Sequence, residues 1–406
     1  MGEKGSKLSN NPNGCEDQVG FNDFKVVRAI GRGAFGKVCI VKRKNTKNDV
    51  YAMKYMNKLD SWKSDVIENI LRELNILTKL HHPFVVNLWF TFQDEEDIFM
   101  VSDLLLGGDL SYHIKKNVMF TLNDACVYLC ELASVLDYLK SKHIVHRDIK
   151  PDNILLDKKG HLHLTDFNIA AIVSQNQPRL KTFAGTKPYV APEVFLASYD
   201  HGSYYDYSAD WWSLGVTIYE VLRRKKPFHI HPDLGHEDAV KLLRNGSISL
   251  PVDWPQSLKD LFFSLLQFDP SKRMNSLSSL LKANFFEKVN EDDILVSCLS
   301  PDFQPSQTSL NYDPTYELEE LIVESNPLHK KKERLQKRRQ SREKILKKSL
   351  RKSDISLTEE QVEETAEEKA MKDVEKHFVT FNRERLSTDT ANTDEVMQKS
   401  KTSVDS

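Results

Sequence analysis

One short stretch of the chain combines residue types that could transfer a phosphoryl group. Residues 146–153 read His-Arg-Asp-Ile-Lys-Pro-Asp-Asn, and the triplet Asp166-Phe167-Asn168 follows. An aspartate that can accept a hydroxyl proton is followed by a lysine two positions later and an asparagine five positions later. A second aspartate comes after them. Such a set can orient an alcohol toward a metal-bound nucleoside triphosphate. The spacing therefore indicates phosphoryl transfer to a hydroxyl group.

A glycine-rich stretch near the N-terminus could hold the phosphates. Gly31, Gly33 and Gly36 have the spacing of a phosphate-covering hairpin, but also that of a dinucleotide-binding βα unit. The continuation Val38–Val41 is β-branched and predicts a returning strand, whereas a dinucleotide site needs a helix at that place. We therefore predict a hairpin whose backbone approaches phosphates closely, because glycine has no Cβ. A dinucleotide-binding oxidoreductase is excluded.

The next elements position a lysine and a glutamate. The strand-like run Tyr51–Lys54 ends in a lysine, and residues 65–80 carry apolar side chains at a helical period. Glu73 lies off the apolar stripe of that helix, where a glutamate is most often a solvated charge. Its position instead makes it the expected ion-pair partner of Lys54, which we predict to bind phosphate.

The later part of the sequence predicts mainly helices. Residues 121–142 predict a helix with Cys126 and Cys130 in the core, and short strands are expected on both sides of a turn at 157–160. His161 and His163 alternate on the second of these strands. Further zinc ligands are not evident nearby, so the sequence predicts surface histidines.

Composition limits the classes of partner and compartment. Lys+Arg 57 against Asp+Glu 59 leaves a net charge of -2, which provides no strong field toward nucleic acid. The 5 cysteines are odd in number and show no CxxC spacing. These features, and the lack of an apolar run long enough to span a bilayer, predict an intracellular, cytoplasmic protein with free thiols. The oligomeric state stays open.

The motifs resemble those of the eukaryotic protein kinases over residues 24–286. Within that superfamily, Thr182–Thr186 leading to Ala191-Pro192-Glu193 is similar to the AGC group of serine/threonine kinases. The Asp-Phe-Asn triplet narrows the resemblance to the YANK branch, the serine/threonine kinase 32 family. Further support for that branch comes from segments 311–320, 327–332 and 381–384.

The resemblance implies an α+β, bilobal protein-kinase fold. A small antiparallel β-rich N-lobe with one major helix would span about residues 24–102, and a larger, mainly helical C-lobe about 108–286. Residues 1–23 would form a flexible leader. Residues 287–406 would form a charged and partly disordered tail.

The resemblance also implies the chemistry and its residues. ATP would supply its γ-phosphate to serine or threonine hydroxyls of protein substrates, with Mg²⁺ as the metal and Mn²⁺ as a substitute. Asp148 and Lys150 are the implied catalytic residues, and Asn153 and Asp166 the implied metal ligands. The implied ATP-binding residues are Ile30, Gly31, Gly33, Gly36, Val38, Ala52, Lys54, Glu73, Asp103 and Leu105.

Other implied roles concern structure and substrate choice. Arg273 resembles the buried partner of Glu193, and Asp210 resembles the anchor of the catalytic loop. Three acids align with positions at which AGC kinases read basic residues upstream of the phosphorylation site. They are Asp109, Asp152 and Glu220. Several carboxylates can bind arginine in a partly desolvated groove, so we expect a basic peptide substrate.

The sequence departs from the family pattern around the activation segment. Asn168 replaces a glycine, and we expect asparagine to tolerate the left-handed backbone there. Ala171 and Asn69 replace residues that often bind the phosphorylated threonine. Arg147 is then the one expected partner of that phosphate. We therefore hypothesise that phosphate on Thr182, the implied regulatory site, organises this segment less than usual.

Both ends of the chain suggest attachment to other surfaces. Met1-Gly2 with Ser6 fits a myristoylation pattern at Gly2, and the basic segment 329–352 could supply a second membrane signal. The plain alternatives are a disordered leader and a solvated tail. Residues 378–381, Phe-Val-Thr-Phe, resemble the hydrophobic motif that AGC kinases dock beside the helix of Glu73. Asn382 stands at its phosphorylation site, which implies docking by apolar burial alone.

Two functions remain to be separated. The first is an active serine/threonine kinase, and the second is a pseudokinase or scaffold that uses the same fold for binding. Pseudokinases usually lack a phosphate lysine, a catalytic aspartate or a metal aspartate. Lys54, Asp148 and Asp166 are all present, which favours the active enzyme.

Overall fold

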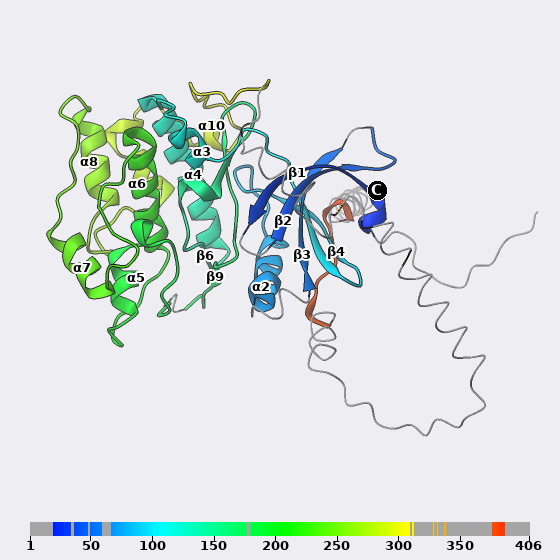
Figure 1. Ribbon diagram of the computed structural model, residues 1–406. Helices are drawn as coiled ribbons and strands as arrows, with labels where there is room; N and C mark the ends of the chain where they lie inside the picture. The colour runs from blue at the N-terminus through cyan, green and yellow to red at the C-terminus, as the bar shows by residue number, and fades with distance from the viewer. Residues whose placement is uncertain are drawn as a thin grey trace, which may run out of the picture.

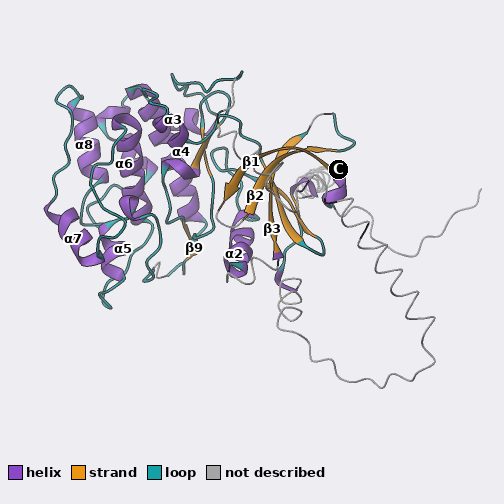
Figure 2. Ribbon diagram, in the orientation of Figure 1, coloured by secondary structure: helices purple, strands orange, loops and turns teal. Residues whose placement is uncertain are grey.

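A computed structural model shows a β-sheet with a single helix beside a larger helical part (Figure 1). The structure describes residues 19–33, 36–47, 49–58, 66–176, 179–308, 311, 328, 331, 337 and 376–385. Strands gather in the first part and helices in the second (Figure 2). This arrangement confirms the predicted α+β fold with an N-terminal antiparallel sheet and a helical C-terminal part.

Some predictions concern residues beyond this description. Gly2, the whole of segment 312–320 and most of the basic segment 329–352 lie outside the described residues. Within the described part of the chain, no helix is both long and apolar enough to cross a membrane.

The sheet is antiparallel and has the strand order β1-β2-β3-β5-β4-β10. Its strands are β1 Phe24–Gly33, β2 Gly36–Arg43, β3 Val50–Asn57, β4 Leu88–Gln93, β5 Asp97–Ser102 and β10 Phe381–Asn382. One face buries a cluster of aromatic rings, in which Phe24 and Phe99 each stack on Phe92. The 3-10 helix η1 Phe21–Asp23 precedes β1, and Phe21 stacks on Phe99. The packed structure therefore begins before residue 24, inside the predicted leader.

The helix α2 Ile67–Leu77 covers the other face of the sheet. Its apolar stripe buries Ile67, Ile70 and Leu74 against Leu88 and Met100 of the strands. This stripe matches the helical period seen in the sequence. The packing holds α2 against the sheet and determines where Glu73 lies.

The helical part is built around two buried helices, α4 Leu122–Ser141 and α6 Ser208–Arg223. Thr121 caps α4, because its hydroxyl accepts a hydrogen bond from the amide of Asp124. The remaining helices are α3 Leu110–Lys115, α5 Pro192–Ala197, α7 His236–Asn245, α8 Gln256–Leu265, α9 Leu277–Leu281 and α10 Glu291–Leu295. Short strands and 3-10 turns join them, namely β6 Ile144–Val145, η2 Pro151–Asn153, β7 Ile154–Leu156, β8 Leu162–Leu164, β9 Ala171–Ile172, η3 Lys187–Tyr189 and η4 Asn284–Phe286.

The buried side chains of this part test two predictions. Cys130 is fully buried and Cys126 packs against the same core, as predicted, and no cysteine in the described part of the chain is in a disulfide. The prediction of a surface position is wrong for His161. Its ring nitrogen Nδ1 lies 2.6 Å from the carboxylate of Glu131 in the core. The alternation of residues along the strand predicted which side chains share a face. It did not indicate that the carboxylate of Glu131 in α4 is buried against that face.

Two tail segments pack on the rest of the chain. Phe303 packs edge to face against Phe120, and its backbone amide donates to the carboxylate of Asp124 at 2.8 Å. Further on, β10 pairs with β4, and Phe378 and Phe381 pack against the cluster that includes α2. The predicted docking of this segment beside α2 is confirmed, but strand pairing and hydrogen bonds hold it as well as apolar burial.

Polar contacts hold residues 331, 383 and 384 of the tail beside the sheet. The guanidinium of Arg383 donates to the carbonyl of Leu80 at 2.7 Å and to that of Leu88 at 2.5 Å. Glu384 pairs with Arg43. Lys331 is fully buried and pairs with Asp97 and with Asp94, 3.0 Å from the latter. Thus charged groups hold the tail at positions where apolar burial alone would not fix its register.

A buried ion pair connects α5 to the far end of the helical part. Both terminal nitrogens of Arg273 donate to the carboxylate of Glu193, with Nη2 at 2.9 Å from Oε2. The Arg273 side chain is 0% exposed, and it also donates to the carbonyls of Ser208 and Gln267. The pair therefore ties the helix after the activation segment to α6 and to the loop before α9, as the family resemblance implies.

Replacement of Arg273 should destabilise the fold. Arg273→Met leaves the Glu193 carboxylate buried without its partner, which costs about 3 to 5 kcal/mol of unfolding free energy. Lys272→Met is the matched control, since Lys272 is 73% exposed and 3.8 Å from Asp269. It should change stability by less than about 0.5 kcal/mol. Urea unfolding followed by circular dichroism measures both, and equal midpoints for the two variants would contradict the role of the pair.

Candidate active site

A cavity of about 330 Å³ lies between the sheet and the helical part. Most of the predicted nucleotide and metal residues line it, namely Ile30, Gly31, Val38, Ala52, Lys54, Glu73, Asp103, Leu105, Asn153 and Asp166. Six apolar lining residues had not been predicted, namely Leu77, Val86, Leu88, Met100, Leu104 and Leu155. They enclose the part of the cavity suited to a flat apolar ring such as adenine. Apolar residues in helices and strands usually belong to the core, so no signal in the sequence identified them.

The hairpin of β1 and β2 covers one side of this cavity. Gly33 pairs with Gly36 at its end, which confirms the returning strand. A Cβ on Gly36 would lie 2.6 Å from the carbonyl oxygen of Tyr55, so a side chain there is excluded. A Cβ on Gly31 would make only an ordinary contact with Val38. Contact of Gly33 and Gly36 with a nucleotide stays a prediction.

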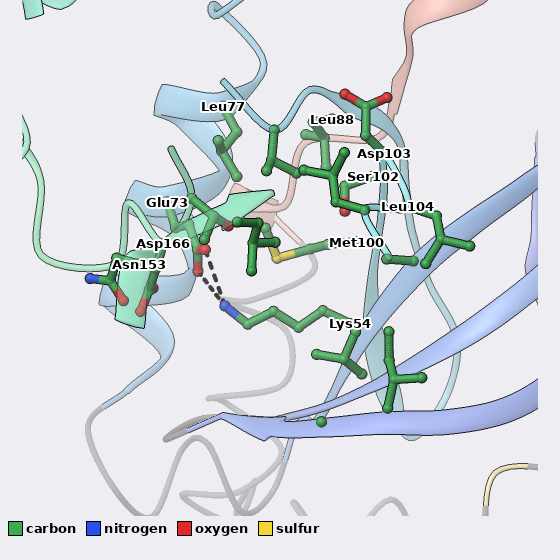
Figure 3. Close-up of a pocket in the computed structure, with 18 of the residues that line it drawn as sticks. Lys54, Glu73, Leu77, Leu88, Met100, Ser102, Asp103, Leu104, Asn153 and Asp166 are labelled. Atoms are coloured by element: carbon green, nitrogen blue, oxygen red, sulfur yellow. Dashed lines mark hydrogen bonds and ion pairs between the residues drawn. The ribbon is translucent and has the colours of Figure 1, made fainter. Parts of the chain in front are cut away.

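Asp103 has a different position from the one expected of a ligand-binding side chain. Its carboxylate accepts from the indole nitrogen of Trp89 at 2.6 Å and from the side chain of Asn87 at 3.0 Å. In Figure 3 that carboxylate is directed away from Lys54. The residue therefore holds the connection between the two parts, and only its backbone remains available to a nucleotide.

Lys54 and Glu73 form the ion pair that the sequence predicts. The ammonium nitrogen of Lys54 lies 2.9 Å and 3.1 Å from the two carboxylate oxygens of Glu73 (Figure 3). Burial lowers the pKa of Lys54, but the charges of Glu73 and Asp166 outweigh it and raise that pKa. Lys54 therefore stays charged inside the cavity, where it can attract phosphate oxygens.

Three polar side chains surround the carboxylate of Asp148 in the catalytic loop. One oxygen of Asp148 accepts from the hydroxyl of Thr186 at 2.7 Å, and the other from Lys150 at 2.7 Å and from Asn153 at 2.9 Å. Burial raises the pKa of Asp148, but these hydrogen bonds from Lys150 and Thr186 outweigh it, so the pKa lies below its ordinary value. Asp148 is thus an ionised acceptor in a fixed orientation. Thr186 had no predicted role.

Asp210 holds the backbone of this loop through two hydrogen bonds. Its two carboxylate oxygens accept from the amides of His146 and Arg147, each at 2.8 Å. Arg147 has a φ of 70°, a left-handed conformation that is strained for a residue with a side chain. The two hydrogen bonds stabilise that conformation, which confirms Asp210 as the anchor of the loop.

Asn153 and Asp166 lie together on the floor of the cavity (Figure 3). One amide oxygen and one carboxylate are a suitable donor set for Mg²⁺, which uses few protein ligands and takes further oxygens from phosphate groups. The left-handed residue of the triplet is Asp166, with a φ of 64°, and not Asn168. The expectation that position 168 needs left-handed backbone is therefore wrong. Phe167 is fully buried against His146, and this packing determines how the triplet turns.

The activation segment contacts the catalytic loop at Thr182. The guanidinium of Arg147 lies 3.4 Å from the Thr182 hydroxyl, and the Tyr205 hydroxyl donates to the Thr182 carbonyl at 2.7 Å. Ala171 belongs to β9, which pairs with β6. Arg147 is the one cation bonded to Thr182 among the described residues. The segment is held largely by contacts that need no phosphate.

The three predicted substrate acids differ in availability. Asp152 is half exposed, with Lys115 at 3.8 Å. Asp109 caps α3 by accepting from the amide of Tyr112 at 2.6 Å. Burial raises the pKa of Asp109, and the nearby charge of Asp152 raises it further. Glu220 is buried and already accepts hydrogen bonds from Tyr189 and Lys226. Asp109 and Asp152 are thus neighbours, whereas Glu220 is satisfied within the protein.

Comparison with known proteins agrees with this geometry. The family model described as protein kinase domain matches residues 24–286. The chain is 46% identical to serine/threonine-protein kinase 32B of Homo sapiens over 371 residues, which are 91% of this chain and 86% of that protein. It is 45% identical to serine/threonine-protein kinase 32C of Homo sapiens, over 91% of this chain and 74% of that protein.

More distant relatives share the same activity. The chain is 35% identical to serine/threonine-protein kinase Sgk1 of Homo sapiens over 303 residues, 73% of this chain and 68% of that protein. A match of this extent identifies the family, and the cavity with its Lys54–Glu73 ion pair, Asn153 and Asp166 agrees with it. The chain belongs to the serine/threonine protein kinases, within the serine/threonine-protein kinase 32 (YANK) family.

Proposed function

We propose that this kinase uses MgATP to phosphorylate serine or threonine in peptide segments that contain basic residues. One observation carries the proposal. The ionised carboxylate of Asp148 lies within hydrogen-bond distance of a hydroxyl, that of Thr186, and beside Lys150 and Asn153. A substrate hydroxyl can take the same position against the carboxylate.

Each side chain would have a separate part in the transfer. Asp148 would orient the substrate hydroxyl and take up its proton as the new P–O bond forms. Its low pKa suits orientation better than early proton removal, because a loose transition state places little charge on the attacking oxygen. Lys150 would stabilise negative charge on the phosphoryl group that moves. Lys54 would bind the phosphates that remain with the nucleotide.

The metal would occupy the floor of the cavity. Asn153 and Asp166 would hold Mg²⁺, with Mn²⁺ as a substitute, and the bound ion would neutralise phosphate oxygens. The Lys54–Glu73 pair keeps Lys54 directed to the same place. Ile30, Gly31, Val38, Ala52 and Leu105 would surround the base and ribose, since all of them line the cavity.

The basic preference depends on Asp109 and Asp152. Burial and the nearby charge of Asp152 raise the pKa of Asp109, and a guanidinium placed between the two carboxylates would stabilise their charges. Asp152 is held only by a solvent-exposed contact at 3.8 Å from Lys115, which is a weak competitor. An arginine of the substrate can therefore take its place.

Asp148→Asn should separate an active kinase from a scaffold. The amide cannot accept the proton, so the rate should fall by about 10²- to 10⁴-fold while the fold is kept. The assay is incorporation of labelled phosphate from Mg²⁺ and ATP into the protein and into serine peptides. Equal incorporation by the variant and the unaltered protein would favour the pseudokinase-like scaffold.

Thr182→Ala should leave the kinase active. A phosphate on Thr182 would pair with one described cation, Arg147. The hydrogen bond from the Tyr205 hydroxyl to the Thr182 carbonyl remains when the Thr182 side chain is replaced by alanine. We expect a rate within about tenfold of the unaltered protein, equivalent to less than ~1.4 kcal/mol of barrier. Thr186→Ala is the comparison, because it removes the hydroxyl that donates to Asp148 and accepts from Lys150, and it should cost more. An inactive Thr182→Ala protein would show that this threonine controls the segment.

Asp152→Asn should reduce the use of basic peptides selectively. For a peptide with arginine before the acceptor we expect kcat/KM to fall about tenfold, the cost of a charged hydrogen bond. The same peptide with alanine should be unaffected. Asp253→Asn, which alters an exposed acid before α8, serves as the control. If the unaltered kinase prefers no basic residue, the proposed substrate class is wrong.

A further inference from the structure

The carboxylate of Glu220 has an internal cation as its partner. The ammonium of Lys226 lies 2.9 Å from Oε1 of Glu220, and the hydroxyl of Tyr189 donates to Oε2 at 2.5 Å. The side chains of Glu220 and Lys226 are 11% and 32% exposed. Both oxygens of the carboxylate are therefore engaged, and its charge is compensated before any peptide binds.

This pair lies along the wall of the catalytic site. Tyr189 belongs to η3, three residues after Thr186, and Thr186 bonds to Asp148. The ammonium of Lys226 is 5.2 Å from the centre of the Tyr189 ring. Burial raises the pKa of Tyr189, and the charges of Glu220, Asp152 and Asp148 raise it further. Tyr189 thus stays protonated, and its hydroxyl connects Glu220 to the groove in which a peptide would lie.

The local backbone turns Lys226 toward Glu220. At the end of α6, Arg224 has a left-handed φ of 54°, and its amide donates to the carbonyl of Glu220 at 2.6 Å. This turn reverses the chain, so a lysine two residues later reaches back over the last turn of the helix. The four residues 223–226 read Arg-Arg-Lys-Lys. The carboxylate therefore lies beside a basic turn.

We propose that Lys226 is a specificity-determining residue, which occupies the Glu220 carboxylate and prevents it from selecting a basic side chain of the peptide. The inference rests on the proposed kinase function and refines its substrate class. An arginine directed at Glu220 must displace a partly buried hydrogen bond and place another positive charge beside residues 223–226. Recognition of basic residues is then limited to Asp109 and Asp152.

The test is a comparison of arginine-scanned peptides. In each peptide an alanine replaces the phosphate acceptor, and one of the positions before it carries arginine. These peptides are titrated against the full-length protein, with fluorescence polarisation as the readout. The proteins are the unaltered kinase, Lys226→Met, and Lys225→Met as the control that removes an exposed charge from the same turn. Because the peptides bind without reacting, the result does not depend on phosphate transfer.

Lys226→Met should gain a preference at one position. There we expect arginine to improve Kd by about tenfold over alanine, the typical effect of a freed buried charge partner, while Lys225→Met keeps the profile of the unaltered protein. Lys226→Gln provides a second variant if Lys226→Met unfolds early in a thermal scan. In a serine series, the gain should appear in KM rather than kcat.

The outcomes separate this inference from the broader proposal. If the unaltered kinase shows no arginine preference and Lys226→Met acquires one, the role of Lys226 holds although the proposed basic substrate class fails. If both Lys226 variants fold and have the arginine profile of the unaltered protein, Lys226 does not determine specificity. An equal gain in Lys225→Met would also overturn the inference, because the effect would then be one of general charge.

Discussion

The two hydrogen bonds that Asp210 accepts from the backbone of the catalytic loop support most of the site. They hold Arg147 in a left-handed conformation, and from there its side chain donates to the carbonyl of Ile169 at 2.6 Å and reaches Thr182. Asp148 follows directly in the chain. One buried carboxylate thus determines where Asp148 points, how the segment after Asp166 runs, and where the activation segment is attached.

A second set of contacts positions the two sides of the cavity, one formed by the sheet and α2 and the other by the helical part. The sheet supplies Lys54, α2 supplies Glu73, and the helical part supplies Asn153 and Asp166. The position of α2 depends on apolar packing against the strands, and the tail adds Phe378 and Phe381 to that packing. A shift of the tail would therefore be transmitted through packed side chains to Lys54, the lysine that we propose binds phosphate.

The sequence was most informative where chemistry and spacing coincide. The catalytic loop, the glycine hairpin and the Lys54–Glu73 pair were predicted because each depends on particular residue types at fixed separations. The burial of His161 was missed, since its partner Glu131 comes from a helix 30 residues earlier and no local pattern links them. The apolar lining of the cavity was missed for the same reason. Leu88 and Met100 look like any buried strand residues.

Polar side chains with several available partners were the least predictable. Asp103 and Glu220 occupy the expected places in the fold, yet their carboxylates are directed to Trp89 and Lys226. Which hydrogen bonds a carboxylate makes depends on short-range geometry that a single sequence does not contain. The left-handed residue of the triplet was likewise placed two positions too late, because the buried ring of Phe167 and not the glycine position determines the turn.

The short strand β10 has a consequence for the solubility of the whole protein. In the described sheet, β4 is paired with β5 on one side and with residues 381–382 on the other. If the tail were removed, the outer side of β4 would expose unpaired amide and carbonyl groups, together with the apolar side chains that Phe378 and Phe381 cover. An exposed edge of this kind is a template for pairing with another molecule. Residues 381–382 thus cover this edge against pairing with another molecule, and Phe378 and Phe381 support α2.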